Sequence, residues 1–496
     1  MKFIGPWLLT IAWLLPSLAA AQEASEADVL RLSLVDCIDL AIKKNVSVRL
    51  SELDVLADQA ALEQSKADLL PSLNANTSYS YSVGRTINEY SYEYVNEPVQ
   101  QQNMSVTADV VVFNSFRKLK TIKRNKLNLS SSQYGLEAQK NDVLLDVVQA
   151  YTQILLNQEL LRNSQFTENT TQSQLERTRR LVEAGSLPMA NALQLEAQQA
   201  TDELNIINAE NNLALAELNL KQLLQIPDDQ DIEIIVPDVD VPETTDLPSS
   251  VDEIYAQALN TLPQIKQAND QISAAQYSID IAKADFYPSI SLSGSIFSRY
   301  SSIAPPQIPK AGVNNVSSIL PTGDFLLAPS GIPGVDPGTR IPILSEYVGP
   351  SEFTDNTYIN QVNSNLQRYA QVNLRIPIFN NWQVRSNVSN ARIGLEQSRL
   401  NALNQRNSVR QTIEQVYLDV KSNAKEYQAA QRRVVSLQRA FQDTERRYQA
   451  QAIDIYAYNQ AKNDLTGAEA NLLQAKYNYL LSLKVLDFYQ GKPVSY

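Results

Sequence analysis

The sequence predicts a mainly α-helical protein with a small membrane β-sheet, built as two copies of one plan. The motif KADLLPS at residues 66–72 returns 217 residues later as KADFYPS at residues 283–289. Two helical runs, at 115–184 and 382–449, have about 70 and 68 residues and would each span about 100 Å if continuous. Four segments of about ten residues alternate apolar and polar side chains, a pattern typical of membrane β-strands.

The chain begins with a segment that reads as a signal peptide. Lys2 precedes an apolar run, and Ala19–Ala21 supplies small residues for cleavage, so we expect residues 1–21 to be removed. A membrane-spanning helix is the alternative, but the run is short and contains Pro6 and Pro16. The lone Cys37 lies too far on for a lipid anchor, and a single cysteine forms no internal disulfide.

The first copy is expected to cover residues 22–224. Pro71 ends its first helix because proline lacks an N–H donor and blocks helical continuation. Two alternating segments and two more helices follow. The expected elements are helices at 33–70, 115–184 and 188–224, with strands at about 73–83 and 104–112.

The second copy is expected to cover residues 251–490, followed by a tail at 491–496. Its outer loop, 301–367, is longer than the corresponding loop of the first copy. Residues 301–350 hold nine of the 22 prolines and six of the 14 glycines, so neither helix nor paired strand is expected there. An acidic linker at 225–250, with a possible strand at 232–236, joins the copies. The expected elements are helices at 251–286, 382–449 and 454–488, with strands at about 289–296 and 370–378.

The alternating segments decide between two environments. A half-buried soluble sheet shows the same period as a membrane strand. An exported chain without transmembrane helices can cross a bilayer only as a closed barrel, and four strands are too few to close one. If the strands enter a membrane, several chains must share one transmembrane β-barrel, and three copies would give about twelve strands.

The helix at 188–224 carries two apolar stripes, which indicates neighbours on both flanks. A wall of helices curling into an α-helical barrel fits this pattern, whereas an ordinary bundle core is the alternative. One stripe comprises Leu193, Ala197, Ala200, Leu204, Ile207, Ala214 and Leu218, and the other comprises Ile206, Ala209, Leu213, Ala216, Leu220 and Leu223.

Composition argues against catalysis and against nucleic acid. The chain has no histidine, which removes histidine bases and the commonest metal ligand, so no enzyme activity, cofactor or metal site is expected. The net charge of −12 disfavours a nucleic-acid partner, and the basic run at 117–126 reads as a helix surface.

In these motifs the chain resembles the TolC family of outer-membrane efflux proteins. The resemblance rests on both KADxxPS junctions, on Phe113-Asn114 and Phe379-Asn380, on the stretch 179–198, and on 475–489. It implies a homotrimer in outer-membrane lipid, with a shared twelve-stranded barrel and a periplasmic α-helical barrel. It also implies a passive duct that docks to a periplasmic adaptor (membrane fusion) protein and an inner-membrane RND or ABC pump. Drug efflux, metal efflux and type I secretion stay open.

The resemblance also suggests where the periplasmic end and its gate lie. The two helix turns that would dock the adaptor correspond to residues 184–188 and 450–454, and the second turn lacks the family's usual glycine. The candidate docking residues are Gly185, Ser186, Leu187, Pro188, Ala452 and Asp454.

The gate departs from the family pattern. The family's gate tyrosine corresponds to Tyr448, its salt-bridge pair to Asn191 and Ile453, and its acidic ring to Ala457 and Gln460. None of the last four is charged. We therefore expect closure by packing and hydrogen bonding around Tyr448, Asn191 and Gln460, with weak dependence on salt. A periplasmic coiled-coil scaffold with a soluble sheet remains the alternative to a duct.

Overall fold

The computed structural model describes residues 30–88, 90–236, 250–309, 315–327, 336, 339–350 and 352–493. The expected signal peptide and most of the acidic linker lie outside these residues. The chain divides into two compact units. The helical unit comprises the described parts of Met1–Gln59, Leu127–Ile272 and Gln397–Tyr496, and the sheet unit comprises Ala60–Lys126 and Ser273–Glu396.

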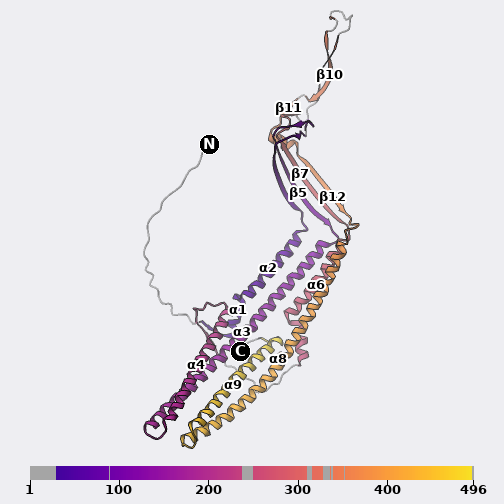
Figure 1. Ribbon diagram of the computed structural model, residues 1–496. Coiled ribbons are helices and arrows are strands. Elements are labelled where there is room, and N and C mark those ends of the chain that lie inside the picture. The colour runs from indigo at the N-terminus through magenta and orange to yellow at the C-terminus, as the bar shows by residue number, and fades with distance from the viewer. Residues whose placement is uncertain are drawn as a thin grey trace, which may run out of the picture. The chain divides into compact units, whose positions relative to one another are not determined.

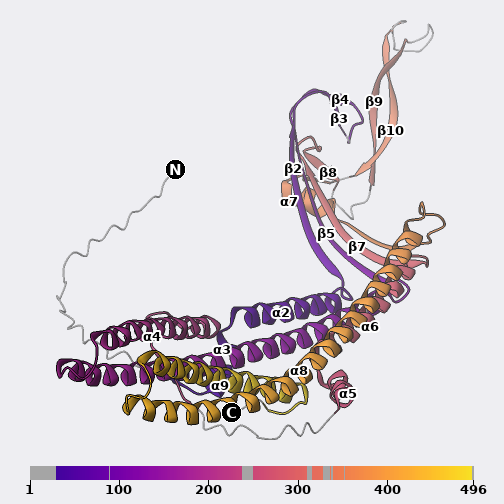
Figure 2. The same cartoon turned by 60° about the horizontal axis from the view of Figure 1, so that its bottom comes forward.

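The helical unit contains two hairpins of long helices, visible side by side in Figures 1 and 2. One hairpin is α3 (Arg117–Glu183) with α4 (Met189–Leu224), and the other is α8 (Gln383–Gln449) with α9 (Ile455–Tyr489). Both α3 and α8 have 67 residues, so the two predicted long helices are confirmed. Each begins in the sheet unit and continues into the helical unit.

The two shorter helical runs each consist of two helices, which corrects the single helices predicted at 33–70 and 251–286. The first run breaks at Asn45, between α1 (Leu34–Lys44) and α2 (Val46–Ala67). The second breaks at Leu262, between α5 (Val251–Thr261) and α6 (Pro263–Ala284). Pro263 suits the first position of a helix, and the Asn45 side chain accepts a bond from the Ser47 N–H at 2.9 Å.

Both runs start at matching N-terminal caps. The hydroxyl of Ser33 accepts from the Asp36 N–H, and the Asp36 carboxylate accepts from the Ser33 N–H. Ser250 and Glu253 make the same capping box, 217 residues later. The repeat therefore begins at the cap, well before the motif that reveals it in the sequence.

A two-stranded parallel sheet, absent from the prediction except for its second strand, lies beside the first hairpin. It pairs β1 (Leu30–Leu32) with β6 (Ile232–Ile234). Its apolar side joins a buried core that includes Val147, Ile154 and Leu220. The Tyr151 hydroxyl donates to the carbonyl of Ile235 at 2.5 Å, which fixes the chain just after β6.

The sheet unit is built on four antiparallel strands in the order β12-β7-β5-β2. The strands are β2 (Ser72–Ser82), β5 (Val99–Phe113), β7 (Ser289–Ser301) and β12 (Gln367–Arg375). The predicted strands are confirmed, although β12 ends at Arg375 instead of residue 378. Figure 1 shows β5, β7 and β12 running together in one curved sheet.

The register confirms that the two sheet faces differ. Val110, Leu292 and Val372 are paired across three strands, and Asp109, Ser293 and Gln371 are paired one residue away on the other face. Because successive side chains point to opposite faces, one face is apolar and the other is polar. The apolar face is open in this chain: Leu73, Leu292, Val372 and Leu374 are all exposed.

The outer loop contains paired strands, which corrects the expectation for 301–350. β9 (Asn315–Leu327) pairs with β10 (Arg340–Pro350), and β8 (Gln307–Pro309) pairs with β11 (Phe353–Asp355). Every strand of a two-stranded ribbon is an edge strand, so a proline without an N–H can sit on its unpaired side. A short helix, α7 (Tyr358–Ser364), follows, and the corresponding loop of the first copy holds β3 (Thr86–Ile87) and β4 (Tyr94–Val95).

Strand passes to helix through the same tight turn in both copies. Ser115 and Phe116 have φ of 53° and 62°, and Asn381 and Trp382 have φ of 49° and 62°. The Arg117 N–H bonds to the Asn114 carbonyl at 3.0 Å, and the Gln383 N–H bonds to that of Asn380 at 2.9 Å. Two consecutive positive φ values with this bond define a type I′ turn. In each copy an aromatic residue, Phe116 or Trp382, occupies the second of these positions, directly before the long helix.

Candidate functional site

The two helical hairpins end in turns of the same geometry. The Gly185 N–H bonds to Val182 at 2.9 Å and the Ser186 N–H to Leu181 at 2.8 Å, which together form a Schellman motif. The second turn repeats both bonds, from Gln451 to Tyr448 at 2.9 Å and from Ala452 to Arg447 at 2.8 Å. The second turn has Gln451 where the first has Gly185. Its backbone hydrogen bonds are the same, but a non-glycine residue must adopt the left-handed conformation.

Gly185 has a φ of 72°, and Gln451 takes the same left-handed region at 56°. A side chain costs about 1–2 kcal/mol in this conformation. We expect Gln451→Gly to stabilise its turn by about 1 kcal/mol and Gly185→Ala to destabilise its turn by a similar amount, because an added methyl would meet no described atom within 4 Å and only backbone strain would change. Amide hydrogen exchange at Ala452 and Ser186 measures both effects. If both substitutions stabilised their turns, or both destabilised them, backbone strain would not be the cause.

The helices that follow the turns are capped differently. Asp454 accepts a bond from the Ala457 N–H at 2.9 Å and caps α9, whereas Pro188 occupies the N-cap of α4 without a side-chain bond. The helix that was predicted to begin at Pro188 therefore begins one residue later, at Met189. Among the predicted docking residues, Leu187 is half-buried and the others are exposed, namely Gly185, Ser186, Pro188, Ala452 and Asp454.

An apolar cluster next to the turns draws side chains from all four helices. Its most buried members are Leu175, Ala192, Leu195, Tyr448, Ile455 and Tyr458. The rings of Tyr448 and Tyr458 stack with centroids 4.9 Å apart, and Phe441 lies 5.5 Å from Tyr458. Burial, with smaller contributions from Glu445 and Tyr448, raises the pKa of Tyr458 to about 12. These aromatic contacts hold α8 against α9, and Leu175, Ala192 and Leu195 of the first hairpin pack in the same cluster.

The structure places the five predicted gate residues in different surroundings. Tyr448 and Ile453 belong to the apolar cluster. The Tyr448 hydroxyl is buried and has no hydrogen-bond partner among the described residues, so the expected hydrogen bonding around it is not seen in this chain. Asn191 and Ala457 are half-buried, whereas Gln460 is exposed and donates to Asp464 at 3.0 Å. Their gating roles stay predictions.

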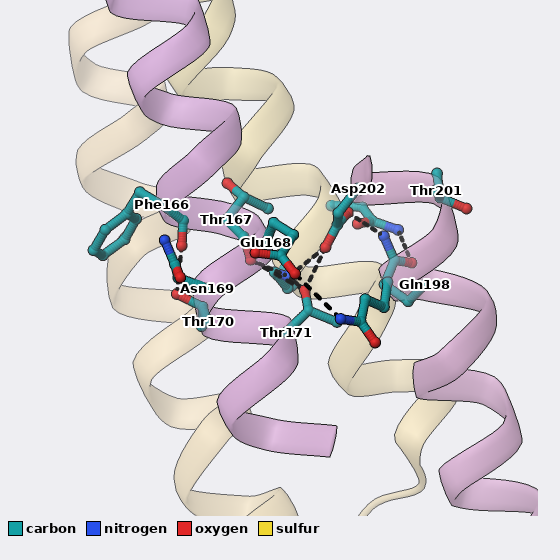
Figure 3. Close-up of polar contacts among 12 residues, drawn as sticks. Phe166, Thr167, Glu168, Asn169, Thr170, Thr171, Gln198, Thr201 and Asp202 are labelled. Carbon is teal, nitrogen blue, oxygen red and sulfur yellow. Dashed lines mark hydrogen bonds and ion pairs between the residues drawn. The ribbon is translucent and has the colours of Figure 1, made fainter. Parts of the chain in front are cut away.

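A buried ion pair that the sequence did not suggest lies further along the same hairpins. The Lys462 ammonium on α9 is 3.1 Å from the Asp202 carboxylate on α4, with side chains 6% and 3% exposed. It also donates to the Thr167 carbonyl at 3.0 Å and to the Thr171 hydroxyl, both on α3. Figure 3 shows Thr167, Thr171 and Asp202 converging on this point. Burial lowers the pKa of Lys462, and Asp202 opposes part of that shift.

The hydrogen bonds around Asp202 are complete. Its second oxygen accepts from Gln198 at 2.9 Å, and Gln198 in turn accepts from Asn463 of α9 at 3.2 Å. All three N–H groups of the lysine and both carboxylate oxygens are therefore satisfied. We call Lys462, Asp202, Thr167, Thr171, Gln198 and Asn463 the polar clamp. It joins α9 to both helices of the first hairpin.

The described residues contain no group of three or more histidine, cysteine, aspartate and glutamate side chains placed to hold a metal ion. Within the described ranges, no helix has both the length and the apolar character needed to cross a bilayer.

Several solved structures share this fold. CusC aligns over 93% of this chain and 92% of its own, with a TM-score of 0.69 and 19% identity. The CmeC outer membrane channel of Campylobacter jejuni aligns over 92% and 85%, with a TM-score of 0.66 and 16% identity. Outer membrane protein TolC of Escherichia coli (strain K12) is 22% identical over 484 residues, which are 97% of this chain and 85% of that protein.

Long helical hairpins together with a small antiparallel sheet make up the fold that this chain shares with CusC and with the CmeC outer membrane channel. Residues 37–224 and 355–492 match the outer membrane efflux protein family, and the chain belongs to that family. The family is one of channels, located in the outer membrane with the helices in the periplasm.

Proposed function

We propose that three copies of this chain form the exit duct of a tripartite efflux or type I secretion system, which conducts substrates passively from an inner-membrane pump. One observation carries the proposal: among the described residues, the four-stranded sheet leaves its apolar face exposed and both of its edge strands, β2 and β12, unpaired on one side. Unpaired strand edges are stable in a bilayer only if another chain completes the barrel.

The surface of α4 supports more than one copy. In the stripe that contains Ala216 and Leu220, these two side chains are buried inside the chain. The other stripe is open, with Leu193, Leu204 and Ile207 each more than half exposed. A row of exposed aliphatic side chains along a periplasmic helix needs a neighbour to cover it.

The proposed organisation follows the two copies of the sequence. Residues 1–21 are the leader, 22–224 the first copy, 225–250 the linker, 251–490 the second copy with outer loop 301–367, and 491–496 the tail. The exposed turns at Gly185 and Ala452 would contact the periplasmic adaptor protein.

Reconstitution tests the duct. The purified mature chain should run as a heat-modifiable oligomer from outer-membrane fractions and give discrete conductance steps in a planar bilayer. A water-soluble monomer that needs no detergent would instead favour a periplasmic coiled-coil scaffold.

The uncharged gate residues predict how the conductance of the open channel responds to divalent cations. Because Asn191, Ile453, Ala457 and Gln460 carry no charge, millimolar divalent cations on the periplasmic side should reduce the conductance by less than twofold. Replacing Ala457 and Gln460 by aspartate should introduce block, since the added carboxylates would bind cations. Strong block of the unaltered channel would contradict the predicted gate.

A further inference from the structure

The basic run at 117–126 has six basic and no acidic residues in a chain of net charge −12, and the duct alone does not explain it. It forms the first turns of α3, directly after β5. Three of its charges are used within the sheet unit. Arg117 pairs with Asp285 at 2.5 Å, Lys120 lies 4.0 Å from Asp280, and Lys118 donates to the carbonyl of Asp68.

These contacts occupy the faces of α3 that meet α6 and α2. Arg117 and Lys120 point to α6, and Lys118 and Asn125 point to α2, where Asn125 donates to the carbonyl of Ala61 at 3.2 Å. Leu119, Lys123 and Lys126 follow one another at spacings of four and three residues, which share one side of a helix, and the Lys123 ammonium lies 5.9 Å from the centroid of the Tyr277 ring on α6. All three side chains are exposed, and neither lysine has an acidic partner among the described residues.

The second copy presents the same arrangement on α8. At the turn, Trp382 corresponds to Phe116. On the helix, the residues that correspond to Leu119, Lys123 and Lys126 are Arg385, Ser389 and Arg392, each 266 residues later. Trp382 and Phe116 are each 60% exposed. The Arg385 guanidinium lies 4.1 Å from the centroid of the Trp382 ring. Each chain therefore has two exposed faces on which an aromatic ring comes first and basic groups follow.

We propose that these two faces, Phe116-Leu119-Lys123-Lys126 and Trp382-Arg385-Ser389-Arg392, bind the phosphate groups of anionic phospholipids in the leaflet next to the helical end of the sheet. We call them the basic stripes. The proposal rests on the proposed function, since it requires the apolar sheet face to lie in the bilayer.

The order of residues along each stripe matches the order of layers in a membrane. The strands supply the apolar band, and exposed aromatic rings favour the boundary between hydrocarbon and headgroups. Lys123 and Lys126 lie about 9 and 14 Å beyond the start of α3, at 1.5 Å per residue. The headgroup layer is about 5–7 Å deep, so the flexible stem of Lys123 brings its ammonium into the layer, and Lys126 lies within one Debye length, about 10 Å, of its outer edge.

Charge favours this occupant. Basic residues close to an anionic membrane surface each add about fivefold to binding, and the effect fades within a Debye length of about 10 Å. The stripes carry four basic groups and no acidic group in a chain whose net charge is −12, and they lie next to the strands that would enter the bilayer.

Lipid retention by the solubilised oligomer tests the proposal. The full mature protein, purified in a zwitterionic detergent, is titrated with phosphatidylglycerol or phosphatidylcholine, and bound lipid is counted by native mass spectrometry. The wild type should prefer phosphatidylglycerol, and the preference should fall as NaCl rises from 0.1 to 0.5 M. The triple variant K123Q/K126Q/R392Q should lose about fivefold for each charge removed.

A matched variant separates the stripes from net charge. K421Q/K425Q/R439Q removes three exposed basic groups from α8 in the helical unit and should retain phosphatidylglycerol like the wild type. Equal losses in the two variants, or equal binding of both lipids by the wild type, would overturn the proposal. Pore formation in phosphatidylcholine vesicles is measured in parallel: pores without lipid preference would overturn only the stripes, and absence of pores would overturn the duct and the stripes together.

Discussion

Replacing Lys462 by methionine is expected to lower the free energy of unfolding by about 3–5 kcal/mol, because the Asp202 carboxylate would stay buried without its cation. Asp202 is 3% exposed, so water cannot replace the ammonium without rearranging three helices. The side chains of Thr171 and Gln198 would still donate to the carboxylate, but neither carries a positive charge. Denaturant titration of the detergent-solubilised protein, followed by circular dichroism, measures the loss.

Two further variants make this result specific. The double variant K462M/D202L removes both charges, and should recover most of the lost stability because a buried ion pair and an apolar pair of similar size are often nearly equal in free energy. Arg179→Gln breaks a pair with Glu196 at 2.7 Å that is 54% and 39% exposed, and should cost less than about 1 kcal/mol. If Lys462→Met proved as mild as Arg179→Gln, the clamp would contribute little to the contact between hairpins.

Much of the fold follows from local signals in the sequence. Three signals located α3, α8 and the four strands: a proline after a helix, alternation of apolar and polar residues, and long runs of apolar residues at spacings of three and four. Each signal depends on residues that are close in the chain. The duplication added a check, because each element had to appear twice. The break at Asn45 carried a signal too, since its partner position is Leu262, directly before Pro263, but a single continuous helix was expected.

What the sequence did not predict depends on contacts between distant residues. Lys462 and Asp202 are 260 residues apart, and each sits in a helix where a solvated charge is the ordinary expectation. The strand β1 has only three residues, too few for a periodic pattern, and exists because β6 pairs with it. In the outer loop, proline content indicated irregular backbone, whereas hairpin pairing between β9 and β10 accommodates it.

The gate illustrates both cases. The resemblance to the family located Tyr448 relative to the turn, and the structure places Tyr448 in the same cluster as Ile453, while its gating role stays a prediction. Its stacking partner Tyr458 was not predicted. Tyr456 and Tyr458 both lie in the first turn of α9, but only Tyr458 is buried in the cluster. Which tyrosine is buried depends on the phase of α9, and that phase is set by Asp454 at the cap.

A charge placed on the apolar sheet face should have the other large effect. Leu292 lies between Val110 and Val372 in the middle of the apolar pattern, and is 43% exposed in the chain. If that face meets lipid, Leu292→Arg should destabilise the membrane-inserted protein by about 1–3 kcal/mol per chain, because an arginine costs about 2–4 kcal/mol at the bilayer midplane and less toward the interface, and Leu292 is the fourth residue of β7. The measurement is the fraction of protein that folds into vesicles across a urea titration.

The neighbouring residue supplies the control, because one step along a strand changes the face. Ser293 lies between Asp109 and Gln371 on the polar side, where an arginine would meet a carboxylate and water. Ser293→Arg should therefore insert like the wild type, although both variants add the same charge to the same strand. A soluble sheet would tolerate both substitutions about equally, since an exposed arginine costs little in water. Equal behaviour of the two variants would thus remove the bilayer from the explanation of the alternating pattern.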